Sequence, residues 1–330
     1  MTIVSSRLAF RAVAVVAAGG VLACNPQQFA GRAGTRRLSI ATGGTGGVYY
    51  PYGGGIAKVL SEHVENVDAT AEVTAASVDN LKFLRDGKSD IVFTMADTLD
   101  DAVRGEGAFD GSPVPARGLA VLYPNYTHIV TLAGSGIDRL DDLRGKVVSI
   151  GSPGSGTEVV ALRILDVVGI GASEVMTQNL GVSQSVDALK DGKIHAFFWG
   201  GGLPTAAILD LASSPGVRMK MLESAEVVPL LNDRFGSNLY YDVLIPVGTY
   251  PGQAIDIRTV AVANVLAVHE DMSDELAEQI TRALFEHQNE LVAIHPQAKE
   301  LTLYSAVRMS PAPFHAGAIA YYRAVDAWPR

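Results

Sequence analysis

The chain has 330 residues, of which 48% are hydrophobic and 18% are charged, with a net charge of −9 and a single cysteine. This apolar content is enough to bury a core, so a disordered chain is excluded, and the lone Cys24 excludes a disulfide-rich scaffold. Acidic residues outnumber basic ones by 35 to 26, which argues against a nucleic-acid partner. The length suits two domains of ordinary size.

The N-terminus has the layout of a secretory signal. Two arginines precede an uncharged run over residues 12–23, which is shorter than the ~20 apolar residues of a membrane span. A signal peptide is therefore predicted over 1–23, followed by a flexible linker over 24–35. The segment Val-Leu-Ala-Cys24 resembles a bacterial lipoprotein box, which predicts a lipid anchor on Cys24. The alternative is that Cys24 follows an ordinary cleavage site.

Cleavage after residue 23 removes two arginines and no acidic residue, so the mature charge is −9 − 2 = −11. The sequence thus predicts a periplasmic or otherwise extracytoplasmic protein, tethered to the membrane if Cys24 is lipidated.

The body repeats one order of elements at a separation of about 110 residues. The first copy has a strand over 37–41, a glycine-rich loop over 42–48 and then a helix. The second copy has a strand over 146–150, a loop over 151–156 and a helix over 157–168. This order predicts an α/β fold.

A second pair of similar segments strengthens the repeat. Residues 77–82 (Ser-Val-Asp-Asn-Leu-Lys) precede an Asp-Gly pair and a strand over 90–94. Residues 185–190 (Ser-Val-Asp-Ala-Leu-Lys) precede another Asp-Gly pair and a strand over 194–199. In each copy the serine is expected to cap a short helix and Asp-Gly to end it. Two related lobes are therefore predicted.

Each lobe is expected to be a mainly parallel sheet flanked by helices, with a cleft between the lobes at the carboxyl ends of the strands. The predicted boundaries are 36–124 and 246–330 for lobe 1 and 125–245 for lobe 2, with hinges at the crossing points. An apolar stripe over 273–291 predicts a helix that packs on lobe 1.

The two glycine-rich loops are the candidate ligand site. Each leads from a strand into a helix, where the first backbone N–H groups lack partners and the helix dipole is positive. A carboxylate can be held there without lysine or arginine. Ser155-Gly-Thr-Glu158 fits a capping box, so Glu158 is interpreted as a capping residue. Tyr49 and Tyr50 are expected to line a pocket, whereas Trp199 fits a pocket wall and a core position equally well.

Other glycine motifs are absent from the sequence. Tyr49 stands where a dinucleotide fingerprint needs glycine, and neither loop is followed by the Gly-Lys-Ser/Thr of a phosphate loop. The residues around Ser155 do not form a hydrolase elbow. The seven histidines show no metal-binding spacing. No cofactor and no metal are therefore predicted.

Taken together, several segments give the chain a recognisable pattern over about residues 38–323. They are residues 42–53, 71–81, 151–158, 202–204, 248–253 and 259–262. The sequence resembles the TAXI class of solute receptors for TRAP transporters. The resemblance implies a type II-like, two-lobed periplasmic-binding-protein fold that works as a monomer and is not an enzyme. It also implies capture of a small organic anion, such as glutamate or 2-oxoglutarate, and delivery to an ion-gradient-driven TRAP permease.

The residues expected to contact the ligand come from the two loops and from the ends of two strands. They are Thr45, Gly46, Gly47, Val48, Tyr49, Tyr50, Asp97, Ser152, Gly154, Ser155, Gly156, Thr157, Trp199, Gly202 and Pro204.

The chain also departs from the family pattern. Met95-Ala96 stand where such receptors often have Gln-Ser before Asp97, glycines occupy 200–201 in place of bulkier residues, and His195 replaces an acidic residue. Each buried polar group without a partner costs about 1–3 kcal/mol, so a pocket with fewer polar partners disfavours polar ligand groups. The sequence therefore predicts a ligand that is less polar at one end than glutamate.

Two alternatives remain open. The first is a ligand-binding sensor that presents its closed form to a membrane signalling partner. The second is a secreted serine hydrolase that uses Ser152 or Ser155, for which no pattern nominates a base.

Overall fold

The computed structural model describes residue 2 and residues 34–236, 238–308 and 310–329. Apart from residue 2, the signal peptide predicted over 1–23 lies outside the described residues, as do Cys24 and most of the predicted linker. All described helices and strands belong to the compact unit Arg36–Arg330. No helix among the described residues has the length and apolar character that crossing a lipid bilayer demands.

The first lobe opens with three strands that alternate with three helices. These are β1 (Arg36–Ala41), α1 (Tyr49–His63), β2 (Val67–Glu72), α2 (Ser77–Arg85), β3 (Ile91–Met95) and α3 (Ala96–Arg104). The strands pair in parallel in the order β2-β1-β3. The predicted strand–loop–helix plan is confirmed for this copy.

The second lobe has the same succession of elements. These are β5 (Val147–Ser149), α4 (Gly156–Val167), β6 (Met176–Gln178), α5 (Val182–Lys190), β7 (Ala196–Gly201) and α6 (Ala206–Ser213). Its strands also pair in parallel, in the equivalent order β6-β5-β7. The internal repeat of the sequence is therefore a repeat of three-dimensional structure.

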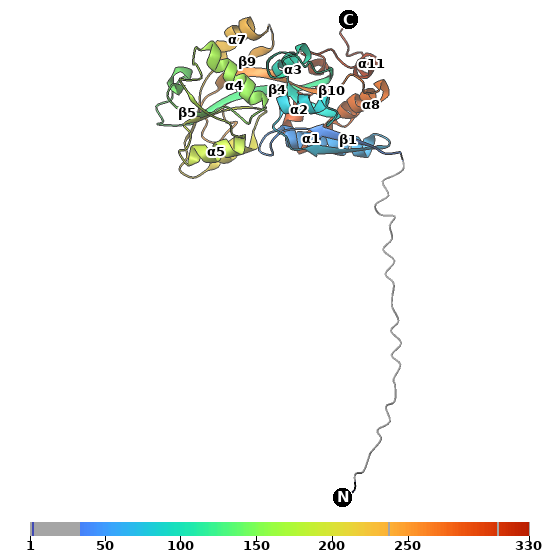
Figure 1. The fold of residues 1–330 in the computed structure, drawn as a ribbon, viewed down its shortest axis with the longest axis horizontal. Helices are drawn as coiled ribbons and strands as arrows, with labels where there is room; N and C mark the ends of the chain where they lie inside the picture. Colours follow the sequence, from blue (N-terminus) through green and yellow to red (C-terminus); the bar gives the residue numbers. More distant parts are fainter. Residues whose placement is uncertain (1, 3–33, 237, 309, 330) are drawn as a thin grey trace. The chain divides into compact units, whose positions relative to one another are not determined.

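Two long antiparallel strands connect the lobes (Figure 1). They are β4 (Ala116–Leu132) and β10 (Ile257–His269). β10 pairs with β3 of the first lobe, and β4 pairs with β7 of the second. The α/β architecture is confirmed, with parallel strands on the outside and antiparallel pairs at the centre.

Hinges are predicted near Tyr123–Pro124 and Ile245–Pro246. In the structure, Tyr123–Pro124 lies inside β4, which continues through it without a break. Ile245 ends β9 (Tyr240–Ile245), which pairs with β10, so β10 is the strand that returns to the first lobe. The lobe boundaries at 124–125 and 245–246 remain predictions.

The other strand and α-helices of the described chain complete the two lobes. They are β8 (Met219–Met221), α7 (Val228–Phe235), α8 (Asp274–Glu286), α9 (Gln288–Ile294), α10 (Leu303–Ala306) and α11 (Ala316–Ala324). The prediction of a single helix over 273–291 is wrong, because the helix is interrupted at His287. α8 ends before this residue and α9 begins after it. Ser273 caps α8, and Leu276 and Leu291 share a core cluster with Ile56 of α1. The predicted packing on the first lobe is confirmed.

Candidate ligand-binding site

A cavity of about 310 Å³ lies where the two lobes face each other. Its walls come from the loop before α1, the segment before α2, the end of β3, the centre of β4, the loop before α4, the start of α5 and the end of β7. Within the described part of the chain, all residues that line it are uncharged. Any charge on a ligand must therefore be met by backbone groups, hydroxyls and amides.

The structure brings most of the predicted site residues together in this cavity. Those that line it are Thr45, Gly46, Gly47, Val48, Tyr49, Ser152, Ser155, Gly156, Thr157 and Trp199. Those that do not are Tyr50, Asp97, Gly154, Gly202 and Pro204.

The start of α1 offers free backbone donors to the cavity. Gly47 donates its N–H to the carbonyl of Gly44, which closes the loop. Among the described residues, the N–H groups of Val48 and Tyr49 have no hydrogen-bond partner. These groups stand at the positive end of a 15-residue helix.

The start of α4, in the opposite lobe, offers a second set of free backbone N–H groups. Ser155 is the N-cap, and its Oγ accepts the N–H of Glu158 at 3.1 Å. The Glu158 carboxylate accepts the N–H of Gly154 at 2.8 Å, whereas the N–H of Ser155 bonds to the carbonyl of Ser152. Glu158 therefore holds the turn before α4, as a structural residue, but the predicted capping box is only half formed. The N–H groups of Gly156 and Thr157 have no partner within the described chain. Two helix starts thus present unpaired donors to one cavity.

Gly154 serves a different purpose from the one predicted. Its carbonyl accepts the N–H groups of Val78 at 3.1 Å and Asp79 at 3.2 Å, both in the first turn of α2. Its φ of +77° favours glycine, and a Cβ there would lie 2.5 Å from the Asp79 carboxylate. The second loop therefore caps a helix of the first lobe, and Gly154 does not line the cavity.

A polar cluster that the sequence reasoning missed lies beside Tyr49. The Tyr49 hydroxyl donates to Oδ1 of Asn264 at 2.5 Å, and Nδ2 of Asn125 donates to the same oxygen at 3.0 Å. Burial raises the pKa of Tyr49, so the hydroxyl keeps its proton. Asn125 and Tyr123 both line the cavity, and Oδ1 of Asn125 and the hydroxyl of Tyr123 are buried with no partner. Within the described chain, these two atoms are therefore buried polar groups without a hydrogen bond at the edge of the cavity.

Trp199 forms a wall of the cavity. Its Nε1 donates to Oγ1 of Thr205 at 2.9 Å, which fixes the indole. A Cβ on Gly47 would lie 2.8 Å from the ring, so the first-lobe loop passes directly against it. The contact explains why the loop carries glycine at this position.

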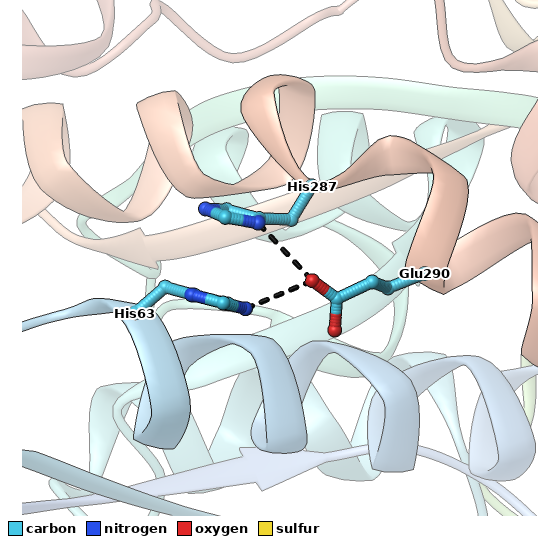
Figure 2. A group of neighbouring side chains, drawn as sticks. All are labelled: His63, His287 and Glu290. Carbon is cyan, nitrogen blue, oxygen red and sulfur yellow. Dashed lines mark hydrogen bonds and ion pairs between the residues drawn. The ribbon is translucent and has the colours of Figure 1, made fainter.

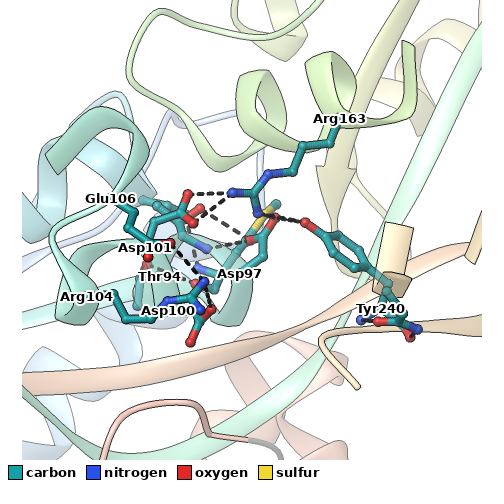
Figure 3. Close-up of polar contacts among 12 residues, drawn as sticks. Thr94, Asp97, Asp100, Asp101, Arg104, Glu106, Arg163 and Tyr240 are labelled. Atoms are coloured by element: carbon teal, nitrogen blue, oxygen red, sulfur yellow. Dashed lines mark hydrogen bonds and ion pairs between the residues drawn. The ribbon is translucent and has the colours of Figure 1, made fainter. Parts of the chain in front are cut away.

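Asp97 lies outside the cavity, in a polar cluster between α3 and α4 (Figure 3). It is fully buried, and its Oδ2 accepts the Tyr240 hydroxyl at 2.9 Å and lies 3.5 Å from Nη1 of Arg163. Burial raises the pKa of Asp97, and the nearby Arg163 opposes that rise. The Asp97 carboxylate therefore already has Tyr240 and Arg163 as partners within the protein. The assignment of Asp97 to the ligand follows from the family resemblance and is wrong here, because Met95 lines the cavity whereas Asp97, two residues later, bonds within the α3–α4 cluster.

The other predicted residues outside the cavity have simpler explanations. Tyr50, the second residue of α1, is exposed to solvent. A Cβ on Gly202 would meet Gln297 and Tyr123 at 2.9 Å, so glycine at this position allows close packing against both side chains. Pro204 immediately precedes Thr205, the residue that fixes the indole.

Solved structures share this fold at low sequence identity. A protein from Bordetella bronchiseptica RB50 is 18% identical with a TM-score of 0.52, over 89% of each chain. An ancestral arginine-binding protein bound to arginine is 17% identical with a TM-score of 0.50, over 79% of this chain and 97% of that one. A weaker similarity is that to the periplasmic aliphatic sulphonate binding protein SsuA from Escherichia coli, at 15% identity and a TM-score of 0.49 over 89% of this chain and 84% of that one.

Among protein families, residues 40–325 match the model of the NMT1-like family, which covers most of the chain. This match does not by itself show the TAXI class, so that finer assignment stays a prediction. The chain belongs to the NMT1-like family.

Proposed function

We propose that this chain is an extracytoplasmic solute receptor that captures a small organic anion, a carboxylate, and delivers it to a membrane permease. The observation that carries the proposal is the uncharged cavity at which α1 and α4, from opposite lobes, both begin. Because the mature chain is strongly acidic, affinity for an anion has to come from local backbone donors rather than from the overall charge.

Capture follows from the geometry of the two helix starts. The free N–H groups of Val48 and Gly156 come from different lobes, so a carboxylate between them replaces water on both sides at once. Shielding from solvent strengthens these hydrogen bonds. A ligand shifts the lobes towards closure only through its higher affinity for the closed form. Bending of β4 and β10, the strands that link the lobes, supplies the motion.

The lining also narrows the class of ligand. No aspartate or glutamate among the described residues lines the cavity, so the ammonium group of an amino acid would be buried without a partner of opposite charge. Met95 lines the cavity, and a Cβ on Gly156 or Gly200 would lie within 2.6 Å of its side chain. These features favour a monocarboxylate with an apolar end over glutamate.

A receptor also fits the site better than the serine hydrolase. No histidine, aspartate or glutamate of the described chain lines the cavity, so Ser152 has no base there. The Ser155 hydroxyl oxygen already accepts the N–H of Glu158. These two features support a site that binds its ligand without catalysing a reaction.

Calorimetry on the purified mature protein tests the capture step. We expect one site per chain, with tighter binding of apolar monocarboxylates than of 2-oxoglutarate or glutamate. Tightest binding of glutamate would overturn the ligand class, and absence of binding by every carboxylate would overturn the function.

Delivery and anchoring need separate measurements. With a TRAP-type permease, uptake in reconstituted vesicles should require the receptor and an ion gradient but no ATP. A requirement for ATP would exclude the TRAP assignment while leaving capture intact. Exclusive partnership with a signalling protein would favour the sensor. Lipidation of Cys24 should appear as added mass on the N-terminal peptide of the mature protein.

A further inference from the structure

The side chains of His63, His287 and Glu290 lie together on the first lobe, where the end of α1 meets the junction of α8 and α9 (Figure 2). His63 is the last residue of α1, His287 stands between α8 and α9, and Glu290 lies in the first turn of α9. Oε1 of Glu290 is 2.8 Å from Nε2 of His63 and 3.1 Å from Nδ1 of His287. The three atoms all lie within 4.8 Å of one another.

We propose that His63, His287 and Glu290 form a binding site for a borderline divalent transition-metal ion, with Zn²⁺ as the reference ion. Two imidazole nitrogens and one carboxylate oxygen are a ligand set that zinc accepts, with the fourth position left to water. Bond lengths of about 2.0–2.1 Å place neighbouring ligands of a tetrahedral site roughly 3.3 Å apart. The two nitrogen–oxygen separations are close to that spacing. Mg²⁺ and Ca²⁺ prefer oxygen ligands alone, so they should not compete.

The Glu290 carboxylate is placed to act as an anionic ligand. Its Oε1 is within hydrogen-bond distance of a nitrogen on each imidazole, so one oxygen already contacts both rings.

Metal binding requires a local rearrangement of the two rings. They are stacked with centroids 3.5 Å apart and planes 8° from parallel, so their lone pairs do not yet converge. The side chains are 31% and 27% exposed, which leaves room for each ring to turn. The nitrogens that contact Glu290 must be unprotonated in the complex, so each neutral imidazole then carries its proton on the other nitrogen.

The affinity and the consequence of binding follow from the surroundings. Among the described residues, neither distal ring nitrogen has a hydrogen-bond partner, so the site lacks the outer-sphere support that tightens metal binding. The ion would link the end of α1 to the start of α9, two helices that already pack where Gly55 meets Leu291 and Ile294. This link lies within the first lobe and is independent of the proposed capture of a carboxylate.

The test uses untagged mature protein that has been stripped of metal with a chelator and titrated with Zn²⁺ by calorimetry. We expect one Zn²⁺ per chain in the wild type, with a higher thermal midpoint, and no comparable binding of Mg²⁺. His63→Gln and His287→Gln should each weaken Zn²⁺ binding by at least about tenfold. Glu290→Gln, which keeps the size of the side chain, should also weaken it. The matched control is His269→Gln, because His269 lies 3.5 Å from a single carboxylate, that of Asp271.

Wild-type protein that binds no Zn²⁺, or His63→Gln and His287→Gln variants that keep full affinity, would overturn the proposal. Equal affinity for Mg²⁺ would overturn the assigned class of metal. Thermal melts of each variant without metal show that a loss of binding is not a loss of fold.

Discussion

Nη2 of Arg163 donates to both carboxylate oxygens of Asp101, at 2.8 and 2.6 Å, across the boundary between α4 of the second lobe and α3 of the first. Both side chains are nearly buried, at 13% and 10% exposure. Nη1 donates to the Tyr240 hydroxyl at 2.8 Å, and the guanidinium stacks on Phe235. The pair therefore holds the two lobes together at a distance from the ligand cavity.

Arg163→Met should destabilise the protein by about 3 kcal/mol, because it leaves the Asp101 carboxylate buried without its partner. Denaturant unfolding measures this loss. The control is Arg139→Met, which removes an exposed pair with Asp141 and should cost less than about 1 kcal/mol. An equal loss of unfolding free energy in the two variants would show that the buried pair stabilises the protein no more than the exposed pair does.

A negative charge placed in the cavity should oppose an anionic ligand. Gly44 lines the cavity, and a Cβ there meets no atom within 4 Å, so Gly44→Asp adds a carboxylate without a clash. We expect carboxylate binding to weaken by about tenfold or more. Gly44→Asn has the same shape without the charge and should bind nearly as well as the wild type. Calorimetry that finds the two variants alike would contradict an anionic ligand.

The contact between Gly47 and Trp199 can be tested with one methyl group. Gly47→Ala places its Cβ 2.8 Å from the indole, so the ring has to move away from the cavity wall. We expect a shift in tryptophan emission and weaker ligand binding, with unfolding free energy reduced by about 1–3 kcal/mol at most. Gly44→Ala is the control in open space. Unchanged emission and affinity in Gly47→Ala would mean that Trp199 does not shape the site.

His128 should make the fold sensitive to acid. Burial lowers the pKa of His128 to about 4, against 6.5 for an ordinary histidine, and its ring is held between the Tyr126 carbonyl and the Tyr250 hydroxyl. Between pH 6.5 and 4 the unfolded chain binds a proton that the folded chain does not, so stability falls as the pH falls. The loss approaches about 3 kcal/mol near pH 4.

Unfolding free energies at pH 7.5 and pH 4.5 measure this effect. His128→Gln should lack this part of the pH dependence, although it loses stability at both pH values. An identical slope in the wild type and the variant would rule out His128 as the source.

Much of the fold could be predicted because its signals are local. The Asp-Gly pairs end α2 and α5 as expected, with φ values of +65° at Gly87 and +69° at Gly192. The serines do not cap these helices. Ser77 accepts the N–H of Met95, and Ser185 lies inside α5 and bonds to Ser149. A hydroxyl has several possible partners, and distant residues decided which one it uses here.

The site was predictable only where it depends on local geometry. A loop before a helix shows its free donors in the sequence, so residues such as Val48 and Gly156 were found. Asn125 stands on an apolar strand, and its role arises only where Asn264 of β10 comes beside it. His63 and His287 are more than 200 residues apart, so no spacing in the sequence indicates that their rings stack.

The bonds from Val78 and Asp79 to the carbonyl of Gly154 have a consequence for following the protein in solution. Both amide groups donate to an acceptor on the opposite lobe. They can therefore exchange with deuterium whenever the two lobes separate and these hydrogen bonds break. Their hydrogen-exchange rates therefore report how often the unloaded molecule opens, and a bound solute should slow both together.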